Sequence, residues 1–237
     1  MIPRKIHYCW YGRRPFPGLV KKCMASWKKH CPDYQVVRWD ETNSPLEDNL
    51  YIRQAYRSQR WAFVSDYVRL YGLEKDGGIY LDTDVELLRP LDPYLEHDAF
   101  LGFESPEKIA TCVIGAAPQH ALIQEIIGSY SQRTFQRADG SLDETTNVDK
   151  LTELLLGMGL CRDGSRQTVA GAEVYPAEFF SPKSLGTGRL MVTENTVAIH
   201  HFQASWMSPR QRLHTYIAQR IGEKNTEMVK RWLGRKQ

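Results

Sequence analysis

Two aspartates separated by a single residue, Asp82 and Asp84, directly follow a short apolar stretch at 79–81. Its β-branched and aromatic side chains are typical of a buried strand, and two glycines at 77–78 mark a turn before it. Two carboxylates at the end of one strand can bind one hard divalent cation, which keeps coordination positions for phosphate. The spacing predicts a metal-assisted site for a phosphorylated substrate. The alternative is a solvated strand end, where Asp is common.

An acid and a base, Asp66 and Arg69, lie three residues apart shortly before this strand. The apolar spacing of residues 60–75 predicts a helix, on which positions i and i+3 share one face. An exposed ion pair is one interpretation of the two residues. However, the neighbours of Asp66 at 63–64 and 67–68 are apolar or aromatic, and a charge in such surroundings is costly unless it is paired or functional. Both interpretations stay open.

Two adjacent histidines, His200 and His201, lie near the end of an apolar stretch at 196–202 that predicts the last strand. Neighbouring side chains on a strand point to opposite faces, so we expect only one histidine to face the aspartates. A neutral imidazole would complete a Mn²⁺ site with two carboxylates, and a hydrogen-bonded core histidine is the alternative. Trp10 and Trp206 could stack on a flat base or close a pocket, or they could fill the core.

The first forty residues contain a strand, a helix and a second strand, at 5–11, 19–30 and 34–39. This order predicts a βαβ unit and a parallel sheet. Ligands of such sheets bind at the carboxyl ends of the strands, where we expect the polar residues above to meet. Further expected helices cover 49–57, 60–75, 118–130 and 148–156; further strands cover 79–81, 99–103, 110–116, 168–175 and 196–202; and a mobile charged loop covers 132–145.

The composition bounds the class of protein. The 237-residue chain has 42% hydrophobic and 25% charged residues, which is ordinary for a globular protein. No Pro/Gly/Ser-rich linker divides it, so we predict a single domain with a core at 1–206 and a helical extension at 207–237. The net charge of +3 fits an anionic small substrate or a weak attraction to acidic lipid, and it argues against nucleic acid.

Several classes of protein are disfavoured. The five cysteines are odd in number and contain no Cys-x-x-Cys pair, which argues against disulfides or zinc and favours a reducing compartment. The N-terminus lacks the apolar core of a signal peptide, and no run approaches the ~18 apolar residues of a membrane span. We therefore expect a cytoplasmic protein. The motifs of P-loop enzymes, dinucleotide-binding proteins and serine hydrolases are absent from the sequence.

Four segments, taken in order, resemble one family of enzymes. They are 2–7 with Trp10, 61–69, 77–84, and 200–201 with 205–206. From residue 2 to about 206, the chain resembles glycosyltransferase family 32, the sugar transferases with a DXD motif. This group includes initiating mannosyltransferases of the yeast type and bacterial capsule or polysaccharide transferases, and the glucosylating domains of large clostridial toxins look like distant relatives.

The resemblance implies an α/β protein with the GT-A fold, a Rossmann-like mixed sheet flanked by helices, here with additional C-terminal helices. It implies a UDP- or GDP-sugar as donor, Mn²⁺ or Mg²⁺ as the ion, and a glycan or lipid-linked oligosaccharide as acceptor, without nucleic acid. The implied reaction is a retaining hexose transfer, which we place in surface polysaccharide synthesis. No side chain stands out as a covalent nucleophile, so we expect the acceptor to return from the front face.

The resemblance also implies roles for individual residues. Asp84 would bind the metal directly, Asp82 would be shared between the metal and the donor's sugars, and His200 or His201 would be a further ligand. The implied donor contacts are Trp10 at the nucleobase, Asp66 and Arg69 with Ser65 on the same helix at the donor sugar and diphosphate, Tyr80 near the ribose or sugar, and Trp206 over the leaving phosphate.

The chain departs from the family at 110–115, where many relatives carry Asn-Thr-Gly, so Asn147 or Glu104 is the alternative source of that contact. Two other functions stay open: a sugar nucleotidyltransferase, although residues 12–15 match its glycine-rich, lysine-bearing loop poorly, and a non-catalytic carbohydrate-binding or assembly protein. The missing N-terminal anchor favours a bacterial cytosolic enzyme. The basic segment 207–237 could rest on acidic lipid at the inner face of the cytoplasmic membrane.

Overall fold

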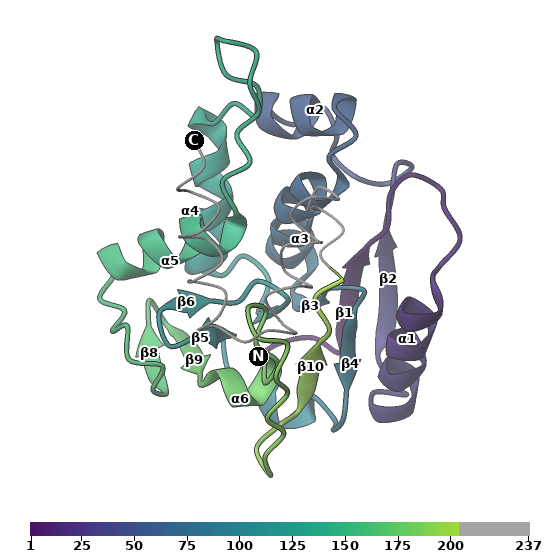
Figure 1. Cartoon of the computed structure of the whole chain (residues 1–237), viewed down its shortest axis with the longest axis vertical. Helices are drawn as coiled ribbons and strands as arrows, with labels where there is room; N and C mark the ends of the chain where they lie inside the picture. Colours follow the sequence, from purple (N-terminus) through teal and green to yellow (C-terminus); the bar gives the residue numbers. More distant parts are fainter. Residues whose placement is uncertain (204–237) are drawn as a thin grey trace, which may run out of the picture.

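The computed structural model describes residues 1–203, in which helices pack on both sides of a central sheet (Figure 1). The strands are β1 (Lys5–Cys9), β2 (Gln35–Trp39), β3 (Gly78–Leu81), β4 (Val85–Leu87), β5 (Ala99–Ser105), β6 (Lys108–Ile109), β7 (Val113–Ala116), β8 (Gln167–Val169), β9 (Ala172–Tyr175) and β10 (Ala198–His200). The helices are α1 (Gly18–His30), α2 (Leu50–Arg57), α3 (Trp61–Asp76), α4 (Ala121–Gly128), α5 (Asn147–Gly157) and α6 (Ala177–Phe180), with 3-10 helices η1 (Asp92–Tyr94) and η2 (Ser129–Gln132). Within this part of the chain, no helix is long and apolar enough to cross a membrane.

The main sheet has the strand order β2-β1-β3-β7-β5-β9-β8, and β6 pairs with β5. β1 is parallel to β2 and β3, β7 is antiparallel to β3 and β5, and β5 is parallel to β9. β1, β3 and β5 therefore run in the same direction and end at the same edge of the sheet. The predicted βαβ unit forms from β1, α1 and β2, and the sheet as a whole is mixed.

The side chains of β3 enter two hydrophobic cores. Ile79 and Leu81 belong to the core that contains Trp27 of α1, whereas Tyr80 belongs to the core that contains Val64 of α3. Successive side chains of a strand point to opposite faces, so the two cores lie on the two faces of the sheet. Burial on both faces explains why the stretch before Asp82 is continuously apolar.

A turn of two glycines connects α3 to β3. Gly77 and Gly78 have φ values of +61° and +113°, which only glycine adopts readily. A Cβ on Gly77 would lie 2.6 Å from Pro118 Cδ, and a Cβ on Gly78 would lie 2.9 Å from the carbonyl oxygen of Lys5. The chain reverses within this tight space, so that α3 lies beside β3 and its polar residues reach Asp82.

A separate two-stranded sheet brings the histidines to the aspartates. β4 begins directly after Asp84 and pairs antiparallel with β10, so that His200 lies opposite Val85. The N–H of His201 also donates to the carbonyl of Asp84 at 3.0 Å, and Trp27 Nε1 donates to the carbonyl of Val85 at 2.7 Å. The end of the described chain is thereby held against the end of β3.

Several predicted strands were wrong in extent, and of the strand expected at 196–202 only Ala198–His200 forms. Residues 168–175 form the hairpin β8-β9 instead of one strand, because Ala170 and Gly171 have φ values of 49° and 77° and turn the chain. The strand expected at 110–116 covers only Val113–Ala116. The short elements β4, β6 and α6 were not predicted.

The segment 132–145, predicted to be a mobile loop, is anchored to the core. Phe135 is fully buried, and the side-chain oxygen of Gln54 accepts hydrogen bonds from the N–H groups of Phe135 and Gln136, both at 2.9 Å. Phe135, together with Leu142, which packs against the same core, thus fixes a segment whose composition is mostly polar. The predicted extension at 207–237, its membrane contact and Trp206 lie outside the described residues and stay predictions.

Candidate active site

Asp84 and His200 form a buried pair where β3 and β10 end. His200 Nε2 lies 3.3 Å from Asp84 Oδ1, and the N–H of Gln203 donates to Asp84 Oδ2 at 2.7 Å. Burial disfavours the ionised carboxyl, but the hydrogen bond and charge of His200 outweigh it and lower the pKa of Asp84. Burial also disfavours the imidazolium, but the neighbouring Cys112 and Asp84 raise the pKa of His200 well above its ordinary value.

The two carboxylate oxygens of Asp82 have different neighbours: Oδ1 contacts Tyr80 and Arg69, and Oδ2 faces His200. The hydroxyl of Tyr80 donates to Asp82 Oδ1 at 2.8 Å, and Arg69 Nη2 lies 3.5 Å from the same oxygen. Asp82 Oδ2 lies 4.0 Å from His200 Nε2. Tyr80 is only 2% exposed, so the role that the structure gives it is to position Asp82, while a contact with the donor stays a prediction.

The donor set of Asp82, Asp84 and His200 fits a divalent cation. One ligand atom from each residue lies within 4.8 Å of the other two. Two carboxylates and an imidazole suit Mn²⁺, and the carboxylates alone suit Mg²⁺. The structure therefore brings together the residues that the sequence predicted as metal ligands, apart from His201.

His201 points to the other side of β10. Its Nε2 lies 2.8 Å from Glu86 Oε2, and the same carboxylate accepts a hydrogen bond from Lys22 Nζ at 2.8 Å. This is the alternation expected for adjacent residues of a strand. Of the two histidines, His200 lies with the aspartates and His201 does not.

Arg69 contacts the carboxylates of both Asp66 and Asp82. Its guanidinium donates to Asp66 Oδ1 at 2.7 Å, to the carbonyl of Thr111 at 2.6 Å and to that of Ser65 at 3.2 Å. The side chains of Arg69 and Asp66 are 5% and 12% exposed, which excludes a surface ion pair. With its donors engaged inside the protein, Arg69 fixes Asp66 and Asp82, and its contact with the donor diphosphate stays a prediction.

Asp66 has an unusual environment for a carboxylate. Burial raises its pKa to about 6, although Arg69, Arg133 and a hydrogen bond from Asn147 lower it. Asn147, an alternative source of the missing family contact, therefore lies against the site. A strongly shifted pKa beside a charged cluster is typical of functional sites.

Trp10 and Ser65 are the remaining described residues that were predicted to contact the nucleotide-sugar donor. Trp10 follows β1 at the same sheet edge, is partly exposed, and packs against Phe16 with ring centroids 4.9 Å apart. Its Nε1 donates to the carbonyl of Arg14 at 2.8 Å. A fixed, accessible ring suits stacking on a base. The hydroxyl of Ser65 donates to the carbonyl of Ala62 within α3 at 2.7 Å.

Glu104 is a further charged residue near the cluster. It lies at the carboxyl end of β5, the edge where Asp82 ends β3. Burial raises its pKa, and the charges of His200 and Lys108 act against that shift. In the sequence, Glu104 could have been found from its position directly after the strand predicted at 99–103. Thr111 carried no such signal, because it contributes through its carbonyl.

The fold defines the class of protein. A solved structure titled "PaToxG Glycosyltransferase" superposes on this chain with a TM-score of 0.52, at 16% identity, over 66% of this chain and 69% of that one. This likeness concerns the fold, and it confirms the predicted GT-A class of α/β protein.

Part of the sequence matches a family of sugar transferases. Residues 17–101 match the family described as "Glycosyltransferase sugar-binding region containing DXD motif". This region carries Asp66, Arg69, Asp82 and Asp84, and it is similar to the DXD-containing sugar transferases, the family that the sequence was predicted to resemble. His200 lies beyond the matched residues, so its place at the site comes from the structure.

Two yeast proteins are among the similar sequences. Inositol phosphoceramide mannosyltransferase 3 of Schizosaccharomyces pombe is 32% identical over 56% of this chain and 38% of its own length. Mannosyl phosphorylinositol ceramide synthase CSH1 of Saccharomyces cerevisiae is 33% identical over 54% of this chain and 35% of its own length. The chain thus spans less than half of either relative.

Proposed function

We propose that the protein is a metal-dependent glycosyltransferase that moves a hexose from a UDP- or GDP-sugar to a glycan or lipid-linked acceptor. The observation that carries this proposal is the cluster of Asp82, Asp84 and His200 around one possible cation position. The two aspartates lie in the region shared with the DXD sugar transferases.

The charges at the site suit cleavage of a sugar–phosphate bond, which leaves negative charge on the diphosphate. When bound by Asp82, Asp84 and His200, Mn²⁺ or Mg²⁺ supplies Lewis-acid stabilisation of that charge. Arg69 keeps Asp82 in position through their contact at 3.5 Å, and its positive charge favours the departing phosphate. Trp10 would bind the nucleobase by stacking.

We propose that the transfer retains the anomeric configuration, with the acceptor hydroxyl approaching from the face that the diphosphate leaves. Asp66 is paired with Arg69 at 2.7 Å and accepts from Asn147, so it is a poor covalent nucleophile. Front-face attack needs no such nucleophile. Proton NMR of the product, which distinguishes the two anomers, tests this part of the proposal.

The names of the relatives favour particular substrates. Both yeast proteins are named for mannosyl products on phosphorylinositol ceramide, which supports mannose as the hexose and an acceptor that carries a phosphorylinositol group. A surface polysaccharide is the alternative acceptor, as the sequence predicted. Donor hydrolysis measured separately with GDP-mannose, UDP-glucose and UDP-galactose distinguishes the hexose and the base.

The central test is hydrolysis of the nucleotide sugar without acceptor, with Mn²⁺ and with chelator. We expect release of nucleoside diphosphate only with the metal, and an Asp84→Asn variant should lose it by at least ~100-fold, since a direct ligand is removed. Asp98→Asn, at an exposed position, is the control. Metal-independent release, or full activity of Asp84→Asn, would refute the proposal, and pyrophosphate release from an NTP and a sugar phosphate would favour a nucleotidyltransferase.

A further inference from the structure

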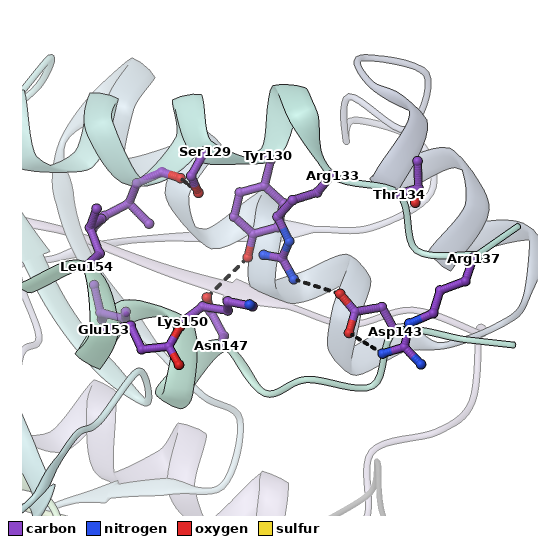
Figure 2. Close-up of a pocket in the computed structure, with 12 residues that line it drawn as sticks. Ser129, Tyr130, Arg133, Thr134, Arg137, Asp143, Asn147, Lys150, Glu153 and Leu154 are labelled. Atoms are coloured by element: carbon purple, nitrogen blue, oxygen red, sulfur yellow. Dashed lines mark hydrogen bonds and ion pairs between the residues drawn. The ribbon is translucent and has the colours of Figure 1, made fainter.

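A cavity of about 550 Å³ (Figure 2) is lined in part by Asn147, the residue that lies against Asp66. It is formed by the end of α4, η2, the segment that follows η2, and α5, and its lining is Ile126, Ser129, Tyr130, Arg133, Thr134, Arg137, Asp143, Asn147, Lys150, Leu151, Glu153 and Leu154. The volume is within the range of ~300–1,000 Å³ that is typical of small-molecule sites. The cluster of Asp82, Asp84 and His200 contributes none of this lining.

Hydrogen bonds join the cavity to the carboxylate site. The hydroxyl of Tyr130 donates to Asn147 Oδ1 at 3.1 Å, as Figure 2 shows. Asn147 in turn donates to Asp66, and Arg69 connects Asp66 to Asp82. A molecule that contacts Asn147 in the cavity would therefore be linked to Asp82 through Asn147, Asp66 and Arg69.

Arg133 is a largely buried cation in the cavity wall. Its guanidinium packs over the rings of Tyr51 and Tyr130, 4.5 and 4.6 Å from their centroids. Its side chain is 15% exposed, and its ion pair with Asp143 is long, at 3.9 Å. Its buried Nε has no hydrogen-bond partner among residues 1–203. The long ion pair leaves the charge of Arg133 only partly compensated, so the position favours an anion in the cavity.

The lining carries more positive than negative charge. Arg133, Arg137 and Lys150 oppose Asp143 and Glu153, three charges against two. The two arginines converge on Asp143 in Figure 2, with Arg137 Nη2 at 3.2 Å from Oδ1. One carboxylate cannot neutralise both, and arginine donors suit the oxygens of a phosphate in particular.

The rest of the lining suits a molecule rich in hydroxyl groups. Ser129 and Thr134 offer hydroxyls, Asn147 an amide and Glu153 a carboxylate, so the lining contains both donors and acceptors. We propose that this cavity is the acceptor site, and that the acceptor is a polyhydroxylated group that carries a phosphate. The acceptor role rests on the proposed transferase function, whereas phosphate binding in the cavity does not.

Titration calorimetry of the full chain with myo-inositol 1-phosphate, and with neutral myo-inositol, tests the anion site. We expect the phosphate compound to bind at least tenfold more tightly. The double variant Arg137→Gln/Lys150→Gln should lose about tenfold in affinity for the phosphate compound and nothing for the neutral one. Arg137→Lys, which keeps the charge, should retain most of the affinity. Lys29→Gln, exposed on α1, removes one charge elsewhere and should change nothing.

Equal affinity of the double variant and the unchanged protein for the phosphate compound would overturn the proposal, as would equal affinity for the two inositols. Donor hydrolysis without acceptor is measured in parallel. Its absence from the unchanged protein would refute the transferase function alone, and its loss in the double variant would refute a separate acceptor site. Competition by vesicles of phosphatidylcholine with phosphatidylinositol, compared with phosphatidylcholine alone, assigns the phosphate to a lipid headgroup, and no competition assigns it to a soluble acceptor.

Discussion

His200 Nε2 lies 3.3 Å from Asp84 Oδ1, although most of the described chain separates the two residues. The contact depends on the pairing of β4 with β10, which places His200 opposite Val85, the residue after Asp84. Because successive side chains of β10 point to opposite faces, His201 lies toward Glu86. The candidate metal site is therefore assembled by pairing of two strands, and the local Asp-x-Asp motif supplies only two of its three members.

Replacing His200 by glutamine should weaken Mn²⁺ binding by tenfold or more, because one of three candidate ligands is lost. The same substitution at His201 should leave Mn²⁺ affinity unchanged, because that imidazole pairs with Glu86. Electron paramagnetic resonance of free Mn²⁺ measures both affinities without a need for activity. Two variants with equal affinity, or a larger loss in His201→Gln, would show that the metal is held differently.

Removing the hydroxyl of Tyr80 should disturb Asp82 while preserving the packing below it. Tyr80→Phe loses the 2.8 Å hydrogen bond to Asp82 but keeps the ring under Arg69, whose Cζ lies 4.6 Å from its centroid. We expect a loss of about 1 kcal/mol in the free energy of unfolding and a severalfold lower kcat for donor hydrolysis.

Tyr175→Phe is the matched control for this experiment. It also removes a buried hydroxyl, one that hydrogen-bonds to His97 at 2.7 Å, away from the aspartates. It should cost similar stability in urea denaturation and leave kcat unchanged. If both variants lower kcat alike, the effect of Tyr80 is general destabilisation and not the positioning of Asp82.

The sequence was most informative where function and local structure coincide. The apolar run before Asp82 and the glycine turn predicted β3, and helical spacing predicted α3 with Asp66 and Arg69 on one face. These features depend on neighbouring residues, so a short stretch contains all the information needed. The convergence of strand ends then followed from the βαβ order, because parallel strands end at one sheet edge.

Other features depended on contacts between distant segments. The strand that contains β10 was predicted, but its pairing with the three-residue β4 was not, so the choice between His200 and His201 could not be made. The segment after η2 that lines part of the cavity is held to the core by the buried Phe135 and by Leu142. Two isolated apolar residues in such a segment do not predict where the segment docks.

The pKa of Asp66 gives a test based on pH. Burial raises this pKa to about 6 from an ordinary value of 3.8, so the folded state binds the proton more tightly than the unfolded state. The stabilisation by that proton is complete below pH 3.8 and is lost as the pH rises to about 6. Asp66→Asn keeps the side-chain oxygen that accepts from Arg69 but cannot titrate.

From pH 4.5 to 7, the unchanged protein should therefore lose about 2 kcal/mol of unfolding free energy relative to Asp66→Asn. Urea denaturation of both proteins at the two pH values measures the difference. Asp139→Asn, at an exposed turn where the pKa is lowered by hydrogen bonds from Ser141, should not reproduce this trend. A constant difference between Asp66→Asn and the unchanged protein would show that Asp66 does not titrate in this range.

The glycine turn between α3 and β3 should be intolerant of any side chain. In Gly77→Ala, the new Cβ would lie 2.6 Å from Pro118 Cδ and 2.7 Å from its backbone nitrogen, atoms that no rotamer change can move away. The residue would also have a positive φ of 61°, which is costly for alanine. We expect a loss of roughly 2–5 kcal/mol in the free energy of unfolding.

Gly128→Ala is the control for Gly77→Ala, because the Cβ at position 128 meets no atom within 4 Å. Gly128 has helical angles, φ −58° and ψ −34°, so alanine should stabilise the protein by about 0.5–1 kcal/mol.

The glycine turn at 77–78 also sets the position of α3 relative to β3. At a temperature where Gly77→Ala is still folded, it should therefore weaken Mn²⁺ binding, since Arg69 on α3 holds Asp82 across a distance of 3.5 Å. Unchanged stability and Mn²⁺ affinity in Gly77→Ala would show that the turn does not control the geometry of the aspartates.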